Sequence, residues 1–301
     1  MRLIKKISLL KDFSKITPVL KGFSSDEKFR VTVGITDYLV RFFPLETMNK
    51  RKQEFELLQL VQNYTMYTLK PLEIGDIDGK GYFITNYFQG VDMEDGLGHL
   101  TAEEQYEIGF LAGQELGKIH QIHAPSTEEP WETRKLKKHE RYIREYEKCG
   151  VSFAEEKQVM NFIQSHLHLL KNRPNMLLHD DFHPANLILK DKKLEGIIDF
   201  GRYEWGDPIH DFTKLGLFSR NVSIPFSIGQ LKGYFNGEEP PNQFWEIYSL
   251  YMATILFSNI VWAKNLHPTN LYVLMDKNEV ILKDHDNFTL TKPKWFTEGW
   301  C

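Results

Sequence analysis

One stretch, residues 177–201, constrains the fold of this chain more than any other. Its two short apolar runs, 187–190 and 194–198, flank a charged turn, and this pattern predicts a hairpin of two strands. A register symmetric about that turn places Asn186 directly opposite Asp199. Because cross-strand partners lie about 4.5–5.5 Å apart at their Cβ atoms, these two side chains are expected to share one cation.

The turn leaves the register open. Pairing of the two polar residues requires symmetry about Lys192 and Lys193. The sequence Asp-Lys-Lys is not the Asn-Gly of a tight hairpin, so a longer loop and a shifted register are alternatives. In the symmetric register, an amide oxygen and a carboxylate would suit Mg²⁺, which needs few protein ligands when phosphates and water complete its shell. Asp181 lies five residues before Asn186, on the loop that leads into the same hairpin.

The rest of the chain changes character near residue 90. Residues 1 to about 90 alternate short apolar runs with polar turns, which predicts a small mixed sheet with one helix at 48–62. Further on, Thr101 opens a Thr-x-x-Glu capping box before a run with helical spacing. Residues 124–136 contain two prolines and several charges and predict a loop. Helical patterns dominate the remainder, on both sides of the hairpin.

Two motifs in the opening stretch point to phosphoryl transfer. His179-x-Asp181-x-x-x-x-Asn186 is followed thirteen residues later by Asp199-Phe200-Gly201, as in the catalytic-loop and metal-binding signatures of kinases. The segments 179–186 and 196–201, continued by Gly206-Asp207-Pro208 and Asp211, resemble the most diagnostic segments of the aminoglycoside phosphotransferase family. Members of that family are small-molecule kinases that share the protein-kinase-like two-lobe fold.

The resemblance implies an α+β, bilobal, protein-kinase-like fold. Its small β-rich N-terminal lobe, expected at residues 1–89, carries one main helix, binds the nucleotide and includes the hinge. Its larger, mostly helical C-terminal lobe, expected at residues 90–301, contains the catalytic hairpin, the metal site and the substrate pocket.

The resemblance also assigns roles at matching positions. Asp181 matches the catalytic aspartate that accepts or orients the proton of the attacking hydroxyl, and Asn186 and Asp199 match the two Mg²⁺ ligands. Phosphoryl transfer needs mainly positioning and charge neutralisation, so this small set suffices. His179 is expected to support the loop by packing, and Asp207 and Asp211 are expected to brace it by accepting buried backbone N–H bonds. None of these last three is expected to be catalytic.

The nucleotide lobe departs from the family pattern at one position. Where family members carry a lysine on the third strand, this chain has Arg41, with Glu54 of the following helix as the expected partner and Glu56 as a competitor. Arginine keeps the charge and can bind phosphate with two nitrogens, but it is longer and planar, so the exchange is not neutral. A surface salt bridge is the alternative interpretation of this pair.

Two further segments are expected near the nucleotide. No Gly-x-Gly-x-x-Gly is present, and Ser24 and Ser25 occupy the corresponding turn, where they could donate to phosphates. An ordinary polar turn is an equal alternative there. The stretch 85–88 before Gly90 resembles the hinge between lobes, where adenine would bind the backbone of Asn86 and Phe88.

The acceptor is expected to be small. Protein kinases insert a long activation segment after Asp-Phe-Gly, whereas here Gly206 comes only five residues after Gly201. That interval leaves little platform for a peptide. A carboxylate-lined cleft after residue 205 would suit a polycationic aminoglycoside or an amine. Any single one of its candidates is more often a solvated charge or a core aromatic than a pocket residue. The acidic and aromatic candidates are Glu204, Asp207, Glu238, Glu239, Asp276, Glu279, Asp284, Asp286, Trp205, Trp245, Tyr248, Tyr251 and Trp262.

Composition limits the partners and the compartment. A chain of 301 residues is long enough for two lobes. Hydrophobic residues make up 42% of it and charged residues 26%, which is typical of a globular protein. A net charge of −4 suggests no nucleic-acid or anionic-membrane surface, and no obligate protein partner is evident. Two cysteines and the lack of a signal-peptide pattern predict a cytoplasmic location. The uncharged run from Ile247 to Trp262 predicts a buried core helix rather than a membrane span.

The sequence therefore predicts a phosphotransferase that uses ATP or GTP with Mg²⁺ and acts on a hydroxyl of a small molecule. An aminoglycoside-type antibiotic is the leading acceptor, which would make antibiotic resistance the biological role. A kinase for choline, an amino alcohol or a sugar is the alternative within enzymes. A nucleotide-binding pseudokinase is the alternative outside them, motivated by Arg41 and the sparse glycine loop but opposed by the presence of Asp181, Asn186 and Asp199 together.

Overall fold

The computed structural model of this chain describes residues 3–22, 26–266 and 271–300. It contains two compact units, one formed by Met1–Val91 with Leu187–Gly201 and the other by Asp92–Asn186 with Arg202–Cys301. The sequence predicted a boundary after residue 89 with the hairpin in the second lobe. In the structure the hairpin is part of the N-terminal unit.

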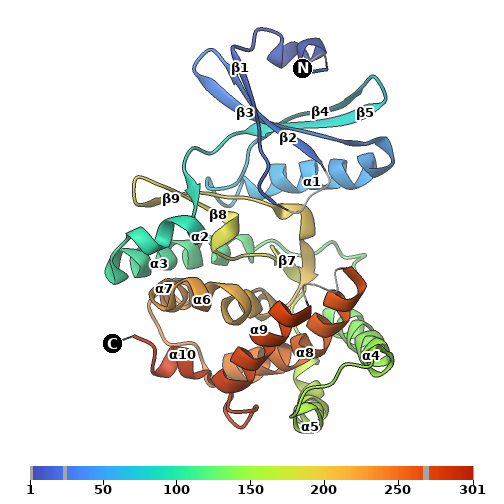
Figure 1. The fold of residues 1–301 in the computed structure, drawn as a ribbon, viewed down its shortest axis with the longest axis vertical. Coiled ribbons are helices and arrows are strands. Elements are labelled where there is room, and N and C mark those ends of the chain that lie inside the picture. The colour runs from blue at the N-terminus through green and yellow to red at the C-terminus, as the bar shows by residue number, and fades with distance from the viewer. Residues whose placement is uncertain (1–2, 23–25, 267–270, 301) are drawn as a thin grey trace. The chain divides into compact units, whose positions relative to one another are not determined.

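The first unit is built on a five-stranded antiparallel sheet in the order β1-β2-β3-β5-β4 (Figure 1). Helix α1 (Met48–Val61) connects β3 to β4, where the sequence predicted it. Apolar side chains at Ile4, Ile7 and Leu10 join Val31 and other sheet residues in one core. The strands are β1 (Lys15–Pro18), β2 (Glu27–Val33), β3 (Thr36–Pro44), β4 (Pro71–Ile77) and β5 (Lys80–Asn86).

The predicted hairpin is present, but its predicted register is wrong by one residue. Strand β8 (Leu187–Lys190) pairs antiparallel with β9 (Lys193–Ile197), and Leu187 lies opposite Ile197. The symmetric register would have paired Leu187 with Ile198. Strand register therefore does not place the two expected metal ligands opposite each other.

Two local features cause the shift. The turn consists of Asp191 and Lys192 alone, with φ of 48° and 60°. Positive φ at both central residues is the geometry of a type I′ turn, which matches the twist of the strands and is most often formed by Asn-Gly. An irregularity between Ile188 and Leu189 then moves the pairing by one residue.

The second unit is mostly helical, with a short antiparallel pair formed by β7 and β10. Helix α3 begins with the predicted capping box, in which Thr101 and Glu104 bond each other's backbone N–H. The elements are β6 (Val91–Asp92), α2 (Met93–Gly96), α3 (Ala102–Ile119), α4 (Trp131–Cys149), α5 (Glu156–His166), β7 (Met176–Leu178), β10 (Glu204–Gly206), α6 (Arg220–Val222), α7 (Ile224–Tyr234), α8 (Asn242–Leu266), α9 (Leu271–Asp284) and α10 (Lys294–Thr297).

Helix α4 starts earlier than the sequence predicted. Residues 124–136 were expected to be a loop, but the helix begins at Trp131, directly after Pro130. The Trp131 side chain is buried, and its indole N–H donates to the Tyr251 hydroxyl at 2.8 Å. This tertiary contact fixes a first helical turn that the local sequence does not indicate.

Helix α8 is the core helix of the second unit. It is long and apolar enough to cross a membrane by length and composition, but 83% of its most apolar window is buried inside the fold. It lies against α4, α5 and α9 (Figure 1). This burial is the one predicted for the uncharged run from Ile247 to Trp262.

Helices α3 and α7 lie side by side and approach each other closely at glycines (Figure 1). A β-carbon built on Gly113 would lie 2.0 Å from the carbonyl oxygen of Gln230, and one on Gly233 would lie 1.8 Å from that of Phe110. Gly109 and Gly229, four residues before these two, are equally crowded. Two Gly-x-x-x-Gly pairs therefore let the backbones meet where any side chain would separate them.

We expect Gly113→Ala to destabilise the protein by about 1–3 kcal/mol, because the added methyl group meets backbone that cannot move independently. Gly117→Ala is the matched control on the same helix, since its β-carbon would lie 3.6 Å from the nearest atom of Tyr234, an ordinary contact. The control should be neutral or slightly stabilising. Urea unfolding of both variants measures the difference, and equal stabilities would contradict this account of the helix pair.

Candidate active site

The loop between β7 and β8 is held by one buried carboxylate. Asp211 accepts the backbone N–H of His179 at 2.8 Å and that of Asp180 at 2.7 Å. The same carboxylate lies 3.0 Å from His120 Nε2, and the other nitrogen of that ring lies 3.0 Å from the hydroxyl of Tyr234. Asp211 is completely buried, so these contacts satisfy a charge that would otherwise be costly.

Asp181 follows directly in this loop and is ionised. Burial raises its pKa, but hydrogen bonding to His183 and the charges of Lys214 and Arg202 outweigh burial and lower that pKa to about 2. His183 Nε2 lies 3.3 Å from Asp181 Oδ1. The carboxylate is therefore available as a proton acceptor at neutral pH.

The amide nitrogen of Asn186 makes a hydrogen bond within this loop. Asn186 Nδ2 donates to the backbone oxygen of Asp181 at 2.8 Å, which brings these two predicted site residues together. Because the nitrogen is engaged within the loop, the amide oxygen is left as the free donor atom for a cation. Oxygen is the atom that Mg²⁺ prefers.

Asp207 has partners other than those predicted. Arg173 donates to both of its oxygens, at 2.7 and 2.9 Å, and the Tyr251 hydroxyl donates to it at 2.7 Å. Its one backbone donor is Ile209, in the short 3₁₀ helix Pro208–Phe212 that Asp207 caps. Of the two carboxylates expected to brace the loop, Asp211 accepts its backbone N–H groups, whereas the hydrogen bonds of Asp207 among the described residues go to Arg173, Tyr251 and Ile209. His179 is fully buried and packs edge-on against Phe182.

In the first unit the structure pairs Arg41 with Glu54. Arg41 Nη2 lies 2.6 Å from Glu54 Oε1, and the guanidinium lies over the ring of Phe83. Glu54 is buried, whereas its competitor Glu56 is exposed. The pair is therefore a buried ion pair and not a surface salt bridge.

A second arginine, which sequence reasoning missed, completes this cluster. Arg51 Nη1 lies 2.9 Å from Glu54 Oε2, and Arg51 Nη2 lies 2.6 Å from Asp26. The spacing of three residues between Arg51 and Glu54 on one helix was the available signal. Two arginines and two carboxylates balance here, so Glu54 keeps a partner if Arg41 turns to a phosphate.

Asp199 belongs to the same unit and has an unusual backbone. Its φ is 65°, a value that non-glycine residues adopt uncommonly and that clusters at functional sites. Within the described ranges its carboxylate has no hydrogen-bond or ion-pair partner. A carboxylate is a hard oxygen donor of the kind that Mg²⁺ prefers.

Four further residues, Asn86, Phe88, Ser24 and Ser25, were predicted to lie at the nucleotide. The backbone N–H of Asn86 donates to the carbonyl of Lys70 at 3.2 Å, so it is not a free donor for adenine. The ring of Phe88 packs on Gly196, where a β-carbon would lie 2.2 Å from it. Ser24 and Ser25 lie outside the described residues.

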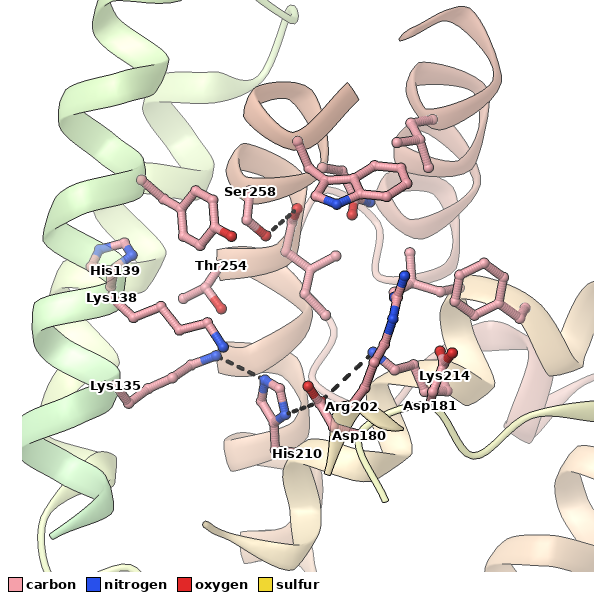
Figure 2. A pocket seen from close by; sticks show the side chains of 17 residues that line it. Lys135, Lys138, His139, Asp180, Asp181, Arg202, His210, Lys214, Thr254 and Ser258 are labelled. Carbon is pink, nitrogen blue, oxygen red and sulfur yellow. Dashed lines mark hydrogen bonds and ion pairs between the residues drawn. The ribbon is translucent and has the colours of Figure 1, made fainter. Parts of the chain in front are cut away.

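A cavity of about 210 Å³ opens beside Asp181 in the second unit (Figure 2). Its walls come from α4, the loop between β7 and β8, the segment after β10, and helices α8 and α9. Asp180 and Asp181 lie at one side of it. Its basic side chains are Lys135, Lys138, His139, Arg202, His210 and Lys214.

The expected carboxylate-lined cleft is therefore wrong for this cavity. None of the eight acidic candidates lines it, and of the aromatic candidates only Trp262 does. The predicted pocket residues all followed residue 203, whereas Lys135 and Lys138, which make this wall of the cavity basic, are on α4, far earlier in the chain. Asp207 instead borders a separate hollow that includes Arg173 and Phe244.

The buried bases of the cavity form a connected chain. Lys135 Nζ lies 2.9 Å from His210 Nε2, and His210 Nδ1 lies 3.3 Å from Asp180. Burial, with the nearby charge of Lys138, lowers the pKa of Lys135 to about 7, and burial also lowers the pKa of His210. Lys138 differs, because Glu204 and Asp180 outweigh burial and raise its pKa.

Solved structures with similar folds include aminoglycoside phosphotransferases. APH(2'')-Ib in its ADP-bound form is 19% identical with a TM-score of 0.65, covering 97% of this chain and 96% of that one. The streptomycin–ATP–APH(2'')-IIa ternary complex is 19% identical with a TM-score of 0.65, covering 96% of both chains. APH(4)-Ia is 15% identical with a TM-score of 0.64, covering 92% of this chain and 96% of that one. These matches confirm the α+β, protein-kinase-like fold.

Comparison with curated proteins gives no match. A family model described as the phosphotransferase enzyme family matches residues 15–245. This match confirms the predicted enzyme class, a phosphotransferase, and covers the catalytic loop, the hairpin and Arg41. Because it spans most of the chain, the protein belongs to the phosphotransferase enzyme family.

Proposed function

We infer that this phosphotransferase moves the γ-phosphate of ATP or GTP, with Mg²⁺, to a hydroxyl group of a small molecule. The observation that carries the proposal is the ionised carboxylate of Asp181 at the wall of a cavity. A hydroxyl bound in that cavity would meet a proton acceptor on a rigidly held loop. Family membership and the kinase-like motifs support the same reaction.

Asp181 is the residue that we assign to the attacking hydroxyl. A carboxylate with a pKa near 2 is a weak base, but loose phosphoryl transfer asks mainly for orientation of the nucleophile. The hydrogen bonds from His179 and Asp180 to Asp211 fix the loop on which Asp181 stands. Positioning of the hydroxyl, with late acceptance of its proton, is therefore the role of this side chain.

Asn186 and Asp199 are the residues that would hold Mg²⁺. When bound, the ion neutralises charge on the phosphate oxygens of the nucleotide. The amide nitrogen of Asn186 is already engaged, which orients its oxygen. We assign Arg41 to the nucleotide phosphates, with the buried Glu54 holding its guanidinium in place.

The nature of the acceptor follows from two observations. The short interval between Gly201 and Gly206 leaves little surface for a peptide substrate. The similar structures include complexes with streptomycin and gentamicin, which supports an aminoglycoside. The basic side chains of the cavity oppose a polycation, and they are the basis of the next subsection.

We expect Asp181→Asn to lower kcat by roughly 10²- to 10⁴-fold, because the amide cannot accept the proton. Nucleotide binding should be unchanged, since no nucleotide contact is assigned to this residue. A coupled nucleotide assay measures turnover, and a thermal-shift titration measures binding. Asp191→Asn, in the exposed hairpin turn, is the control. Retained turnover in Asp181→Asn would remove this residue from the reaction.

Thermal shift with ATP or GTP should depend on Mg²⁺. We expect the metal to increase the shift in the wild-type protein, because Asn186 and Asp199 contribute only when a cation links them to phosphate. Asp199→Asn should abolish the increase while leaving the melting temperature without ligand nearly unchanged. A nucleotide shift that is the same with Mg²⁺ and with a chelator would instead favour a nucleotide-binding scaffold.

Arg41→Met should raise the KM for the nucleotide at least several-fold and lower stability less than Arg51→Met does. The loss of stability is limited because Glu54 keeps Arg51 as a partner, although one arginine then faces two buried carboxylates. Arg51→Met is the informative comparison, since it leaves Asp26 without this partner and should cost mainly stability. An unchanged nucleotide KM in Arg41→Met would show that this arginine is only structural.

A further inference from the structure

We propose that the acceptor of this phosphotransferase is a small hydroxyl compound that carries an anionic group, a carboxylate or a phosphate. The proposal rests on the proposed function, since it takes Asp181 as the position of the reacting hydroxyl. Lys138 and Arg202 are the residues that would bind the anionic group. Both line the cavity that contains Asp181 (Figure 2).

The charges around the cavity leave a positive excess. Asp180 is balanced by Lys214, at 3.8 Å, and contacts His210. Glu204 accepts from Arg134 Nη1 at 3.0 Å as well as from Lys138 Nζ at 3.1 Å. Arg134 also lies 3.2 Å from Glu128, so Arg134 and Lys138 together face two carboxylates. The positive excess belongs to the side chains that line the cavity, among which Lys138, Arg202 and Lys214 outnumber Asp180 and Asp181.

Two cationic groups remain for a ligand. Arg202 is exposed and has no ion-pair partner within the described part of the chain. Lys138 pairs with Glu204, which does not line the cavity, and keeps about a third of its side chain accessible. Figure 2 shows Lys138 extending from α4 across the cavity and Arg202 rising on its other side. An anion held between two such groups receives charge-assisted hydrogen bonds, the strong class for carboxylate and phosphate.

The other polar groups of the cavity suit the rest of such a molecule. Thr254 and Ser258 on α8 donate their hydroxyl protons to carbonyls of their own helix, at 2.8 and 3.1 Å. Their oxygens are therefore left as acceptors for hydroxyl or amino hydrogens of a ligand. A volume of about 210 Å³ is below the roughly 300–1,000 Å³ of pockets for drug-sized ligands.

A polycationic acceptor meets the opposite conditions. Lys138, Lys214 and Arg202 would repel its amines, and Lys135 would add to that repulsion whenever it is protonated. Like charges brought together in a binding site oppose association strongly. Asp181 is the one carboxylate of the cavity left for an amine, and its assigned partner is the reacting hydroxyl.

The test compares ligands that differ mainly in charge. Glucuronate, glucose 6-phosphate, glucose and glucosamine share a hexose ring, and glycerate, glyceramide and 3-aminopropane-1,2-diol share a three-carbon chain. Gentamicin serves as the polycation. Each is measured with the full-length protein by calorimetric binding without nucleotide and by phosphate transfer from Mg-ATP and Mg-GTP. We expect the anionic members to be preferred over their neutral counterparts by roughly 10- to 100-fold.

Variants show whether the named cations cause the preference. Lys138→Met and Arg202→Met should each reduce the ratio of anionic to neutral ligand by about tenfold or more. Lys137→Met is the matched control, because Lys137 is the neighbour of Lys138 on α4 but is exposed and pairs with Glu129. Lys138→Glu should move the preference toward the amine in each series.

The two measurements separate the possible failures. Binding of the anionic members without transfer of phosphate would support the anion site and contradict the proposed function. Preference for glucosamine, the aminodiol or gentamicin would overturn the anion site even if transfer occurs. Unchanged selectivity in both Lys138→Met and Arg202→Met would overturn it as well. Binding of none of the anionic members would overturn it as well. Comparing the affinities for glucuronate and glycerate with the affinity for glucose 6-phosphate shows whether the site prefers a carboxylate or a phosphate.

Discussion

The buried carboxylate of Asp211 is the interaction on which the catalytic loop depends. It accepts two consecutive backbone N–H groups of that loop, from His179 and Asp180, and it contacts His120 at the end of α3. The imidazole in turn reaches the hydroxyl of Tyr234 on α7. Helices α3 and α7 meet through glycines with almost no space between their backbones, so this carboxylate is linked through His120 and Tyr234 to a closely packed helix pair. Precision at the reacting hydroxyl thus originates in helix packing that lies outside the cavity.

The two neighbouring aspartates of this loop, Asp180 and Asp181, have different partners. Asp180 points to His210 and Lys214 and is part of the buried base chain, while Asp181 stays at the cavity with His183. Both remain ionised because surrounding positive charge outweighs the effect of burial on their pKa values. Arg202, one of the cations that keep Asp181 ionised, is also one of the two that we assign to the ligand. A site built in this way favours a substrate that brings negative charge of its own, and it distinguishes this chain from the amine-binding expectation that its family resemblance suggests.

The sequence predicts the parts of this structure that are local. The strands around Arg41, the helix with Glu54, the capping box at Thr101 and the hairpin all follow from short-range patterns, and the fold and enzyme class follow from the motif at 179–201. What it does not predict depends on contacts far apart in the chain. Burial of Trp131 against Tyr251 starts α4 early and brings Lys135 and Lys138 to the catalytic loop, and no local pattern indicates this. The hairpin register failed for a smaller reason, a type I′ turn formed by Asp191 and Lys192 together with one irregularity in the pairing.

The central claim is that this phosphotransferase acts on a hydroxyl compound that is already acidic. The most direct measurement leaves the choice of acceptor to the protein. A small-molecule extract is incubated with the protein and Mg-ATP or Mg-GTP, and mass spectrometry identifies the compounds that gain one phosphoryl group relative to the Asp181→Asn variant. The account predicts that the acceptor carries a carboxylate or phosphate before the reaction. Phosphorylation confined to neutral or cationic acceptors would contradict it.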